Sequence, residues 1–287
     1  MPKVTLVTGV TGNVGQAVAF ELLRRNQEVR GAVLADELPQ AREIFGADIE
    51  LAVFDFNVRE TWSKAFQGVQ RMFLMRPPAI ADVANNINPS VDEAMKIGVD
   101  HFVFLSLLGV AKNPIVPHHK IEKHILRRKA NYTFLRPSFF MQNLIGFFKE
   151  FIVKENILFC PAGHGKTSFI DTRDIAAIGA LALSGDEHIN RAYDLTGGEA
   201  LSYFEVADLM SAELGRKITF ANPGVLAFRR KLTAMKIDPT YINVLTGIFL
   251  TAKFGVAKVV TPDTNLLLGR APITVKQFVA DHREHWV

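Results

Sequence analysis

The stretch "TLVTGVTGNVGQAV", residues 5–18, places Gly9, Gly12 and Gly15 between a run of β-branched residues and an amphipathic segment. Glycines at such a junction allow a tight turn and let backbone N–H groups and the positive end of a helix approach a pyrophosphate. The spacing is G-x-x-G-x-x-G, not the G-x-G-x-x-G of many dehydrogenases. A glycine triplet alone also fits a tight turn with no ligand, so the surrounding pattern has to decide between the two interpretations.

The first half of the chain alternates strand-like and helix-like segments. Strands are predicted at 3–9, 28–34, 49–55, 69–75, 100–109 and 131–140, and helices at 14–26, 38–45, 59–68, 81–98 and about 118–130. The segment 81–98 is expected to break or kink at Pro89. Alternating strands and helices imply right-handed crossovers, and therefore an α/β protein with a doubly wound parallel sheet covered on both faces. In that context the glycine triplet indicates a dinucleotide site.

The pattern changes after about residue 145. A strand end and a helix are predicted over 167–185, and a strand, turn and helix over 192–215, where Ser202 and Glu205 have capping-box spacing. The rest of the chain is expected to be mostly helical. We therefore expect a dinucleotide-binding domain at 1–155 that returns at 169–196. A smaller, mostly helical domain at 197–287, with 156–168, is expected to cap the substrate over the carboxyl ends of the strands.

A competing phosphate site lies in "CPAGHGKT", residues 160–167, which resembles the loop G-x-x-x-x-G-K-[ST] through Gly165, Lys166 and Thr167. Cys160 stands where the first glycine is needed, and no helix follows directly. A glycine-rich hairpin turn is the better interpretation.

Composition narrows the class of protein. With 48% hydrophobic and 22% charged residues among 287, the chain can bury a core. The net charge is +4 and the basic clusters are short, so no nucleic-acid partner is expected. The single cysteine excludes an internal disulfide and fits a reducing cytoplasm. No signal-peptide pattern opens the sequence and no apolar run approaches the about 18 residues of a membrane span, so we expect a cytoplasmic protein without a membrane partner.

Several segments together resemble a known family. They are "VTGVTGNVG", "FDF" after the third strand, "FLMRPP" after the fourth, "FLSLLG" after the fifth, "YTFLRPSFFMQNL", "IDTRDIA" and "YDLTGGEALSYFEVADLMSAELGRKI". The chain is similar to atypical short-chain dehydrogenases/reductases of the NmrA-like family, in the triphenylmethane-reductase and NAD(P)H:quinone-oxidoreductase branch. The glycine motif is shared with the whole superfamily, whereas "LRPSFFMQNL" together with "TGGEALSYFEVADLMS" is much more specific.

The resemblance implies a Rossmann domain that binds NADP(H) or NAD(H), with NADP slightly preferred. The cofactor-binding residues that it implies are Gly9, Thr11, Gly12, Asn13, Val14 and Gly15 at the pyrophosphate, Asp55 and Phe56 at the adenine, Met75, Arg76 and Pro77 at a ribose, and Ser106, Leu107, Pro137, Ser138, Phe139 and Phe140 at the nicotinamide. Two alternatives stay open: Phe139 and Phe140 also fit plain core packing, and Asp55 fits a turn after a strand.

The sequence departs from the family after the second strand. NADP enzymes place an arginine there for the 2′-phosphate, and NAD enzymes an acidic residue for the ribose hydroxyls. This chain has Val33 and Leu34, then Ala35 and Asp36. Asp36 fits a ribose contact or, as the preferred alternative, a cap of the next helix.

The second departure concerns the Tyr-x-x-x-Lys pair of classical members. That position holds His118 and Glu122 or, shifted by one, His119 and Lys123. The catalytic candidates are therefore His118 and His119, with Ser106. A histidine can act as an acid because its ordinary pKa is about 6.5. The alternative is a helix-start histidine that is solvated or holds a loop.

The remaining histidines are not expected to take part in catalysis. His124 is expected to point elsewhere, and no metal site is expected. His282 and His285 fit an exposed tail helix.

Three functions remain open. The first is an NAD(P)H-dependent reductase that passes hydride to a flat, electron-poor acceptor such as a quinone, dye or iminium, under an apolar lid at 224–235 and 241–256. The second is a non-catalytic, NAD(P)-binding redox-sensing regulator. The third is a relative that has lost cofactor binding. A small aromatic or quinone-like partner follows from the first, and the protein is expected to be a monomer or a homodimer.

Overall fold

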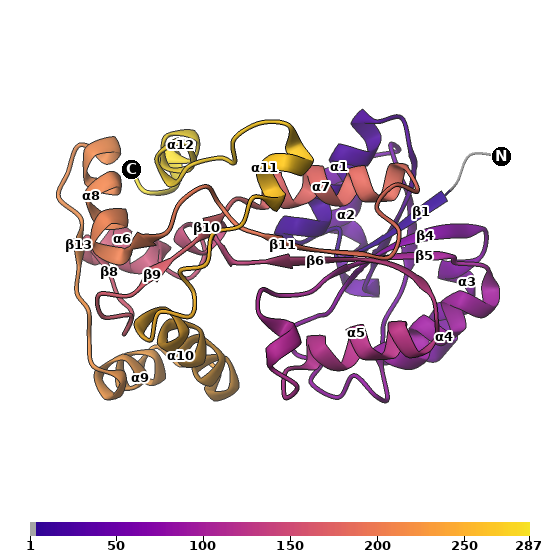
Figure 1. Cartoon of the computed structure of the whole chain (residues 1–287), viewed down its shortest axis with the longest axis horizontal. Coiled ribbons are helices and arrows are strands. Elements are labelled where there is room, and N and C mark those ends of the chain that lie inside the picture. The colour runs from indigo at the N-terminus through magenta and orange to yellow at the C-terminus, as the bar shows by residue number, and fades with distance from the viewer. Residues whose placement is uncertain (1–3) are drawn as a thin grey trace. The chain divides into compact units, whose positions relative to one another are not determined.

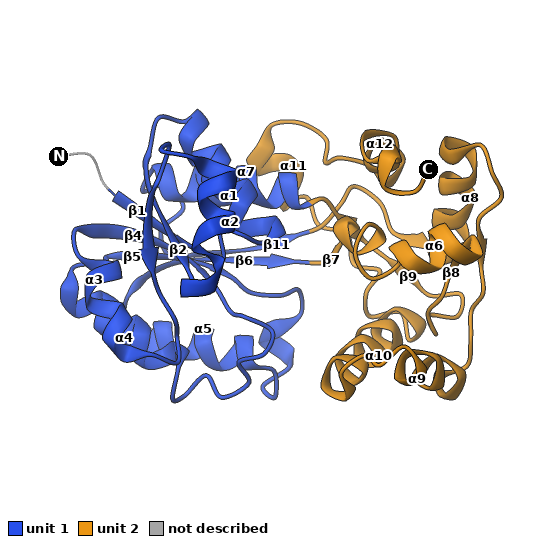
Figure 2. Ribbon diagram, turned by 180° about the vertical axis from the view of Figure 1, so that it is seen from behind, with its two compact units in different colours: residues 1–137, 172–195 blue, residues 138–171, 196–287 orange. Residues whose placement is uncertain are grey.

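The computed structural model describes residues 4–287, so Lys3, where the first strand was expected to start, lies outside the described residues. The chain divides into two compact units, each built from separated segments (Figure 2). Unit 1 comprises the chain up to Pro137 together with Thr172–Leu195. Unit 2 comprises Ser138–Asp171 and Thr196–Val287.

Unit 1 is built on a seven-stranded, wholly parallel sheet in the order β11-β6-β5-β4-β1-β2-β3 (Figure 1). Its strands are β1 Val4–Thr8, β2 Glu28–Val33, β3 Glu50–Val53, β4 Val69–Met75, β5 His101–Leu105, β6 Asn131–Pro137 and β11 Arg191–Leu195. The chain first runs outward from β1 to β3 and then returns to β4 on the other side of β1. This reversal creates a switch point at the carboxyl ends of β1 and β4, where open α/β sheets bind ligands.

Helices cover both faces of this sheet. They are α1 Asn13–Arg24, α2 Leu38–Phe45, α3 Trp62–Phe66, α4 Ile87–Ile97, α5 Pro117–Arg127 and α7 Thr172–Ser184, with 3-10 turns at Ala35–Glu37, Arg59–Thr61 and Val110–Lys112. Figure 1 shows α1 and α7 on one face and α4 and α5 on the other. Gly179 of α7 lies directly against Val18 and Phe73, where a β-carbon would be 3.4 Å from either side chain. The predicted α/β class and doubly wound sheet are confirmed.

Two expectations about helices in unit 1 were wrong. The segment 81–98 contains no kinked helix, because α4 begins only at Ile87 and Pro89 lies in its first turn. A proline there costs no hydrogen bond, since the first N–H groups of a helix have no partner in it. The histidine helix ends at Arg127 rather than near residue 130, and Lys129 beyond it has a positive φ of 56°.

Unit 2 is mostly helical, as expected. Its helices are α6 Lys149–Glu155, α8 Tyr203–Leu214, α9 Val225–Ala234, α10 Pro239–Lys253, α11 Asp263–Leu268 and α12 Val275–Asp281, with 3-10 turns at Met141–Leu144 and Arg283–His285. Three pairs of two-residue strands join its loops: β7 Phe139–Phe140 with β10 Phe169–Ile170, β8 Ile157–Leu158 with β13 Thr219–Phe220, and β9 Lys166–Thr167 with β12 Leu201–Ser202.

The core of unit 2 is aromatic. Phe148, Tyr203, Phe228 and Phe249 are fully buried and contact one another through tilted and edge-on rings. Cys160, the only cysteine, lies in this core with no exposed surface, and burial raises the pKa of its thiol. The predicted capping box is confirmed, because the Ser202 hydroxyl accepts from the Glu205 N–H at 3.2 Å and a Glu205 carboxylate oxygen accepts from the Ser202 N–H at 2.7 Å.

The boundary between the units differs from the expected division. Residues 138–155 were assigned to the dinucleotide-binding domain, but unit 1 leaves this segment at Pro137. Leu144, Phe148 and Ile152 pack instead in the hydrophobic core of unit 2. Unit 1 likewise resumes at Thr172 rather than at residue 169 and ends at Leu195. Apolar spacing alone did not show against which core these side chains pack.

The "CPAGHGKT" segment forms no phosphate loop. Lys166 belongs to β9, and its ammonium group lies 3.0 Å from a carboxylate oxygen of Glu205. A β-carbon at Gly165 would lie 1.9 Å from the Ala252 carbonyl oxygen, so this glycine is required by close packing against α10. The expected hairpin was also wrong, because the flanking strands β8 and β9 pair with different partners.

Within residues 4–287, every helix is too short or too polar to serve as a membrane span.

Candidate functional site

The glycine loop joins β1 to α1 at the switch point of the sheet. Gly9 has a positive φ of 67°, and a β-carbon there would lie 2.1 Å from the Met75 methyl carbon. A β-carbon at Gly15 would lie 2.2 Å from the Gly9 carbonyl oxygen, so α1 packs against the loop only because residue 15 is glycine. The turn is closed by the Gly12 N–H, which donates to the Gly9 carbonyl at 3.0 Å.

The start of α1 fits an anionic group. Gly12 is its N-cap and supplies no side-chain cap, and the first turn contains no acidic residue. A helix leaves its first N–H groups without partners inside the helix, and they carry partial positive charge. Asn13 is exposed and Thr11 is partly buried, whereas the Val14 side chain is buried. These residues therefore fit the pyrophosphate of a dinucleotide.

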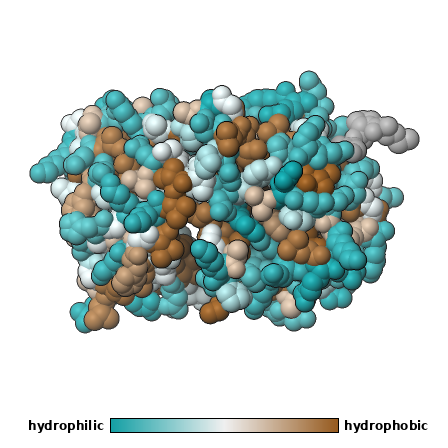
Figure 3. Space-filling model, in the orientation of Figure 1, coloured by the Kyte–Doolittle hydropathy of each residue, from teal (hydrophilic) through white to brown (hydrophobic). Residues whose placement is uncertain are grey.

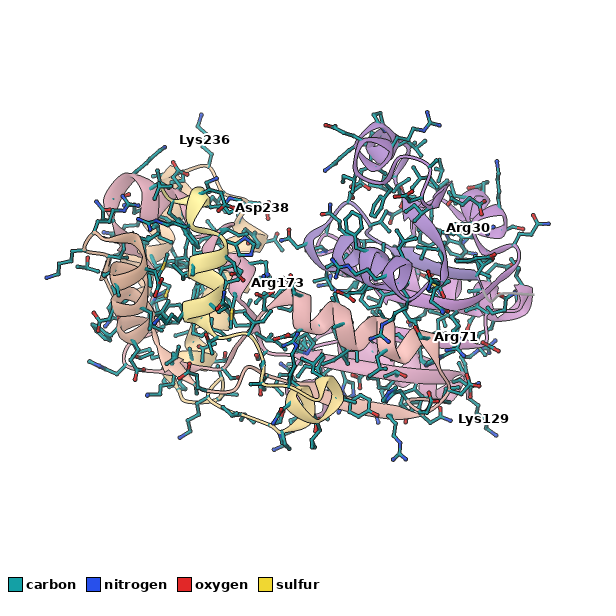
Figure 4. The ribbon with its side chains drawn as sticks, turned by 90° about the horizontal axis from the view of Figure 1, so that it is seen from above. Arg30, Arg71, Lys129, Arg173, Lys236 and Asp238 are labelled. Carbon is teal, nitrogen blue, oxygen red and sulfur yellow. The ribbon has the colours of Figure 1, made fainter. Side chains whose placement is uncertain are left out.

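The segment that follows β2 and enters α2, residues 34–41, contains no lysine or arginine. Glu37 accepts from the Leu34 N–H at 3.2 Å, and Asp36 is exposed. The preferred alternative for Asp36 was wrong, because α2 has no side-chain cap. Arg30, the arginine within β2, has other partners (Figure 4). It binds Glu50 at 2.8 Å and donates to the carbonyl oxygens of Ala65, in the last turn of α3, and Gln67, just after it.

Asp55 and Phe56 form a turn after β3. One Asp55 carboxylate oxygen accepts from the Asn57 N–H at 2.8 Å, and its carbonyl accepts from the Trp62 ring nitrogen at 2.7 Å. The Phe56 ring is buried, edge-on to Phe54 at 4.7 Å between ring centres. Both residues therefore have a structural role in this turn.

Two polar residues, Arg76 and Ser106, follow the carboxyl ends of β4 and β5. Met75 pairs with Leu105, so Arg76 and Ser106 are the next residues along two neighbouring strands. One terminal nitrogen of Arg76, Nη1, donates to the carbonyl oxygens of Pro77, Pro78 and Ile80, whereas its Nε is buried without a partner. Ser106 is 4% exposed, and its hydroxyl has no partner either. Leu107 and Pro77 are only partly buried beside them.

The histidines of α5 have separate environments. The His118 ring stacks on Phe104 at 5.9 Å, and burial, followed by the charge of Arg76, lowers its pKa to about 4. His119 uses Nδ1 to bind the Val110 carbonyl at 3.0 Å, so it holds the preceding loop. His124 binds Asp92 at 2.8 Å, which confirms that it points elsewhere.

Glu122, one turn after His118, forms an ion pair that sequence reasoning missed. Its two carboxylate oxygens accept from Arg136 Nε at 3.0 Å and Nη2 at 2.7 Å, and the glutamate is 5% exposed. The ion pair raises the pKa of the Arg136 guanidinium. The position of the classical lysine therefore holds a neutralised carboxylate. No sequence signal links Glu122 to Arg136, because one lies on α5 and the other on β6.

The residues expected around the nicotinamide fall on both sides of the unit boundary. Pro137 ends β6 in unit 1, whereas Ser138 and Phe139 belong to unit 2. The Ser138 hydroxyl donates to the Ser168 carbonyl. The Phe139 ring lies edge-on to Phe169 at 5.7 Å, as the packing alternative predicted.

A further group of possible ligand atoms lies in the last 3-10 turn. His282, Glu284 and His285 place one ligand atom each within 4.8 Å of one another. The expected exposed tail helix is a short turn here, anchored by Trp286, whose ring nitrogen donates to the Leu144 carbonyl at 3.2 Å.

Comparison with known proteins gives relatives along nearly the whole chain. The NAD(P)H azoreductase of Xenophilus azovorans is 29% identical over 283 residues, which cover 96% of this chain and 97% of the azoreductase. A (4-alkanoyl-5-oxo-2,5-dihydrofuran-3-yl)methyl phosphate reductase of Streptomyces griseus is 30% identical, with 97% of this chain and 98% of the reductase covered.

Solved structures show the same fold. The triphenylmethane reductase of Citrobacter sp., complexed with NADP(H), superposes with a TM-score of 0.86 at 20% identity, covering 97% of this chain and 99% of that one. An NADPH-dependent quinone oxidoreductase of Escherichia coli, complexed with NADPH, gives a TM-score of 0.87 at 21% identity with the same coverage. The NmrA-like family model matches residues 1–258, and this chain belongs to the NmrA-like family.

Proposed function

We propose that the protein is an NAD(P)H-dependent reductase that passes hydride to a small, electron-poor acceptor such as a quinone, a dye or an iminium ion. The observation that carries the proposal is the glycine loop, where Gly9, Gly12 and Gly15 leave the uncapped start of α1 open to a pyrophosphate. Relatives that are named reductases and match over nearly their full length support the same class of reaction.

The residues at the carboxyl ends of β1, β4 and β5 would hold the dinucleotide. The proposed set is Gly9, Thr11, Gly12, Asn13, Val14 and Gly15 at the pyrophosphate, Asp55 and Phe56 at the adenine, Met75, Arg76 and Pro77 at a ribose, and Ser106, Leu107, Pro137, Ser138 and Phe139 at the nicotinamide. When bound, the reduced dinucleotide supplies a hydride. Met75 is fixed for this role by its N–H, which donates to the Thr8 hydroxyl at 2.8 Å.

Two observations bear on the choice of cofactor. NADP(H) is the cofactor of the Citrobacter reductase and NADPH that of the E. coli quinone oxidoreductase. In this chain, however, Leu34 stands where an arginine would meet a 2′-phosphate, and the Glu37 carboxylate lies against the Leu34 N–H. We therefore propose that NADH and NADPH are both accepted.

The histidines give little acid catalysis in this proposal. A pKa of about 4 keeps the His118 ring neutral at pH 7, and His119 holds a loop carbonyl through Nδ1. His118 can still shape the site as a neutral ring and hydrogen-bonding group. Acceptors that take hydride at an electron-poor carbon need little proton donation at the transition state, which fits a site without the Tyr/Lys pair.

The substrate-capping role of unit 2 is part of this proposal. Tyr241, Val244 and Ile248 form an exposed apolar stripe along α10. Figure 3 shows hydrophobic residues, in brown, over the part of unit 2 that carries α9 and α10. Such a surface suits an aromatic or quinone-like substrate.

A second candidate is a dinucleotide-binding redox sensor without turnover. Two features favour it. Glu122, neutralised by Arg136, stands at the position of the classical lysine, and no cation follows β2 to meet a 2′-phosphate. Binding without turnover of any acceptor would identify this function.

The test combines binding with turnover. NADPH and NADH are titrated into the protein by nicotinamide fluorescence, and benzoquinone and a triarylmethane dye are then added. We expect binding below millimolar concentration and oxidation of the cofactor with at least one acceptor.

A matched pair of variants locates the binding site. Gly12→Ala adds a methyl group at the anion-facing start of α1 without a close contact, since its β-carbon would lie 3.5 Å from the nearest atom. It should weaken dinucleotide binding about tenfold or more, by about 1.4 kcal/mol. Gly224→Ala, at the equally uncapped start of α9, is the control and should bind normally. Equal binding by both variants, or no binding by the parent, would refute the assignment.

A further inference from the structure

Arg76 carries a partly buried charge, and the hydrogen bonds that hold it go to carbonyl oxygens rather than to a carboxylate. Burial alone lowers the pKa of its guanidinium, with no opposing contribution from a carboxylate. Three carbonyl oxygens at 2.8–3.1 Å hold Nη1 in place, so the group is fixed rather than mobile. The Nε–H remains buried and unsatisfied. Withdrawing an unpaired charge from water is costly even when the withdrawal is partial, so its retention points to a ligand that supplies the missing negative charge.

Two other arginines of unit 1, Arg71 and Arg136, have a carboxylate partner. Arg71, labelled in Figure 4, binds the Asp186 carboxylate and the carbonyl oxygens of Leu183 and Gly185. Arg136 has both carboxylate oxygens of Glu122. Arg76 therefore differs from its neighbours in lacking an internal counter-charge, although it lies at the ligand-binding end of the sheet.

The groups beside Arg76 would also stabilise an anion. Ser106 follows the neighbouring strand, is almost wholly buried, and has a hydroxyl without a partner. The His118 ring is close enough for the charge of Arg76 to affect it, and it stays neutral. A fixed cation, an unused hydroxyl donor and a neutral ring are the components of a site for an anionic oxygen.

We propose that the Arg76 guanidinium and the Ser106 hydroxyl bind the acceptor oxygen on which negative charge develops during reduction, so that Arg76 would border the cofactor ribose through its backbone only. This inference rests on the proposed function and names its preferred substrate class, the quinones and other conjugated carbonyl compounds. The acceptor gains one hydride, that is, one proton together with two electrons, from a C–H bond of the reduced dinucleotide, which becomes the oxidised pyridinium. A new C–H bond forms on the acceptor, the electron pair of its π system moves onto the carbonyl oxygen to give an oxyanion, and water later protonates that oxygen.

The charge of the product separates two classes of acceptor. A quinone becomes an oxyanion, which a guanidinium stabilises. A triarylmethane cation becomes a neutral leuco dye, so the same guanidinium gives no product stabilisation and repels the substrate. Arg76 should therefore favour quinones over cationic dyes.

The test is a change of selectivity. In Arg76→Met, the ratio of kcat/KM for benzoquinone to kcat/KM for a triarylmethane cation should fall about 100-fold, the loss typical of one oxyanion donor. Ser106→Ala, which removes only a hydroxyl, should lower the same ratio in the same direction. Arg24→Met, at an exposed arginine paired with Glu21, is the control and should leave the ratio unchanged.

A binding measurement tests the site without turnover. In the presence of oxidised dinucleotide, 4-nitrophenol should bind the parent protein as its coloured phenolate. The apparent pKa of the bound probe should be about one unit lower in the parent than in Arg76→Met. If the parent reduces no acceptor, the proposed function fails. The probe measurement still shows in that case whether an anion binds beside Arg76.

Three results would overturn the inference. One is an unchanged selectivity ratio in both Arg76→Met and Ser106→Ala, and a second is an apparent pKa of bound 4-nitrophenol that is the same in the parent and in Arg76→Met. The third is a loss of NADPH and NADH affinity of tenfold or more in Arg76→Met without a change in selectivity, which would assign Arg76 to a cofactor phosphate. Ser106→Ala keeps the test valid if Arg76→Met does not fold.

Discussion

His118 illustrates how one residue acquires its properties from its surroundings. Its ring is stacked on Phe104 at the start of α5, and burial and the Arg76 charge lower its pKa to about 4. The neighbouring His119 is held by a carbonyl group instead. Two adjacent histidines with the same sequence signal therefore have different roles, and only the packing distinguishes them.

The lowered pKa of His118 predicts a pH-dependent stability. The unfolded chain protonates this histidine near pH 6.5, whereas the folded protein resists protonation until about pH 4. The contribution is therefore complete above pH 6.5 and is lost as the pH falls toward 4, by on the order of 3 kcal/mol. Urea unfolding of the parent and of His118→Asn between pH 7.5 and 4.5 measures it.

The variant should lose stability less steeply with falling pH than the parent. His164→Asn, at an exposed histidine, controls for the removal of one titratable group and should follow the parent curve. Parallel curves for the parent and His118→Asn would contradict the assigned pKa.

Among the elements, α8 begins at a capping box. The Glu205 carboxylate accepts from the Ser202 N–H and also lies 3.0 Å from the Lys166 ammonium group, so the box ties α8 to β9. The backbone hydrogen bond from Ser202, together with Lys166, lowers the pKa of Glu205 to about 2. An acidic residue with a lowered pKa stabilises the folded state above its ordinary pKa, and the effect is lost as the pH falls below it.

Removing this cap should weaken unit 2. Ser202→Ala deletes the hydroxyl that accepts from the Glu205 N–H, and we expect a loss of about 1 kcal/mol in the free energy of unfolding. Chemical denaturation at pH 7 measures the difference. Ser63→Ala, at an exposed serine within α3, should change the stability by less than about 0.5 kcal/mol. A loss in Ser202→Ala no larger than in this control would show that the box is not stabilising.

The elements also show what sequence can predict. β1, α1, β2 and β4 were predicted within one or two residues, because alternation and apolar periodicity are local properties. The Glu122–Arg136 pair was not, because it forms only when α5 packs beside β6. The segment after Pro137 was assigned to the wrong unit, since its apolar side chains fit either core by spacing alone. Local patterns thus predicted the sheet and the glycine loop, whereas partners between elements required the fold.

At the scale of the whole molecule, the chain passes between the two units three times, after Pro137, Asp171 and Leu195. Unit 1 is completed by α7 and β11, which come from the return segment. Neither unit is therefore a continuous piece of sequence, since residues 138–171 interrupt unit 1 and residues 172–195 interrupt unit 2. This connectivity explains why composition shifts along the chain gave approximate boundaries only.

The reactivity of the buried Cys160 can report how often the core of unit 2 opens. It is the only thiol of the chain, it lies wholly inside the core of unit 2, and burial raises its pKa. A thiol reagent can reach it only while that core is open. The rate of its modification under native conditions should therefore follow the opening of unit 2 alone, measured by mass spectrometry as one added label. Slower labelling in saturating NADPH than in buffer would show that dinucleotide binding lowers the rate at which the core of unit 2 opens.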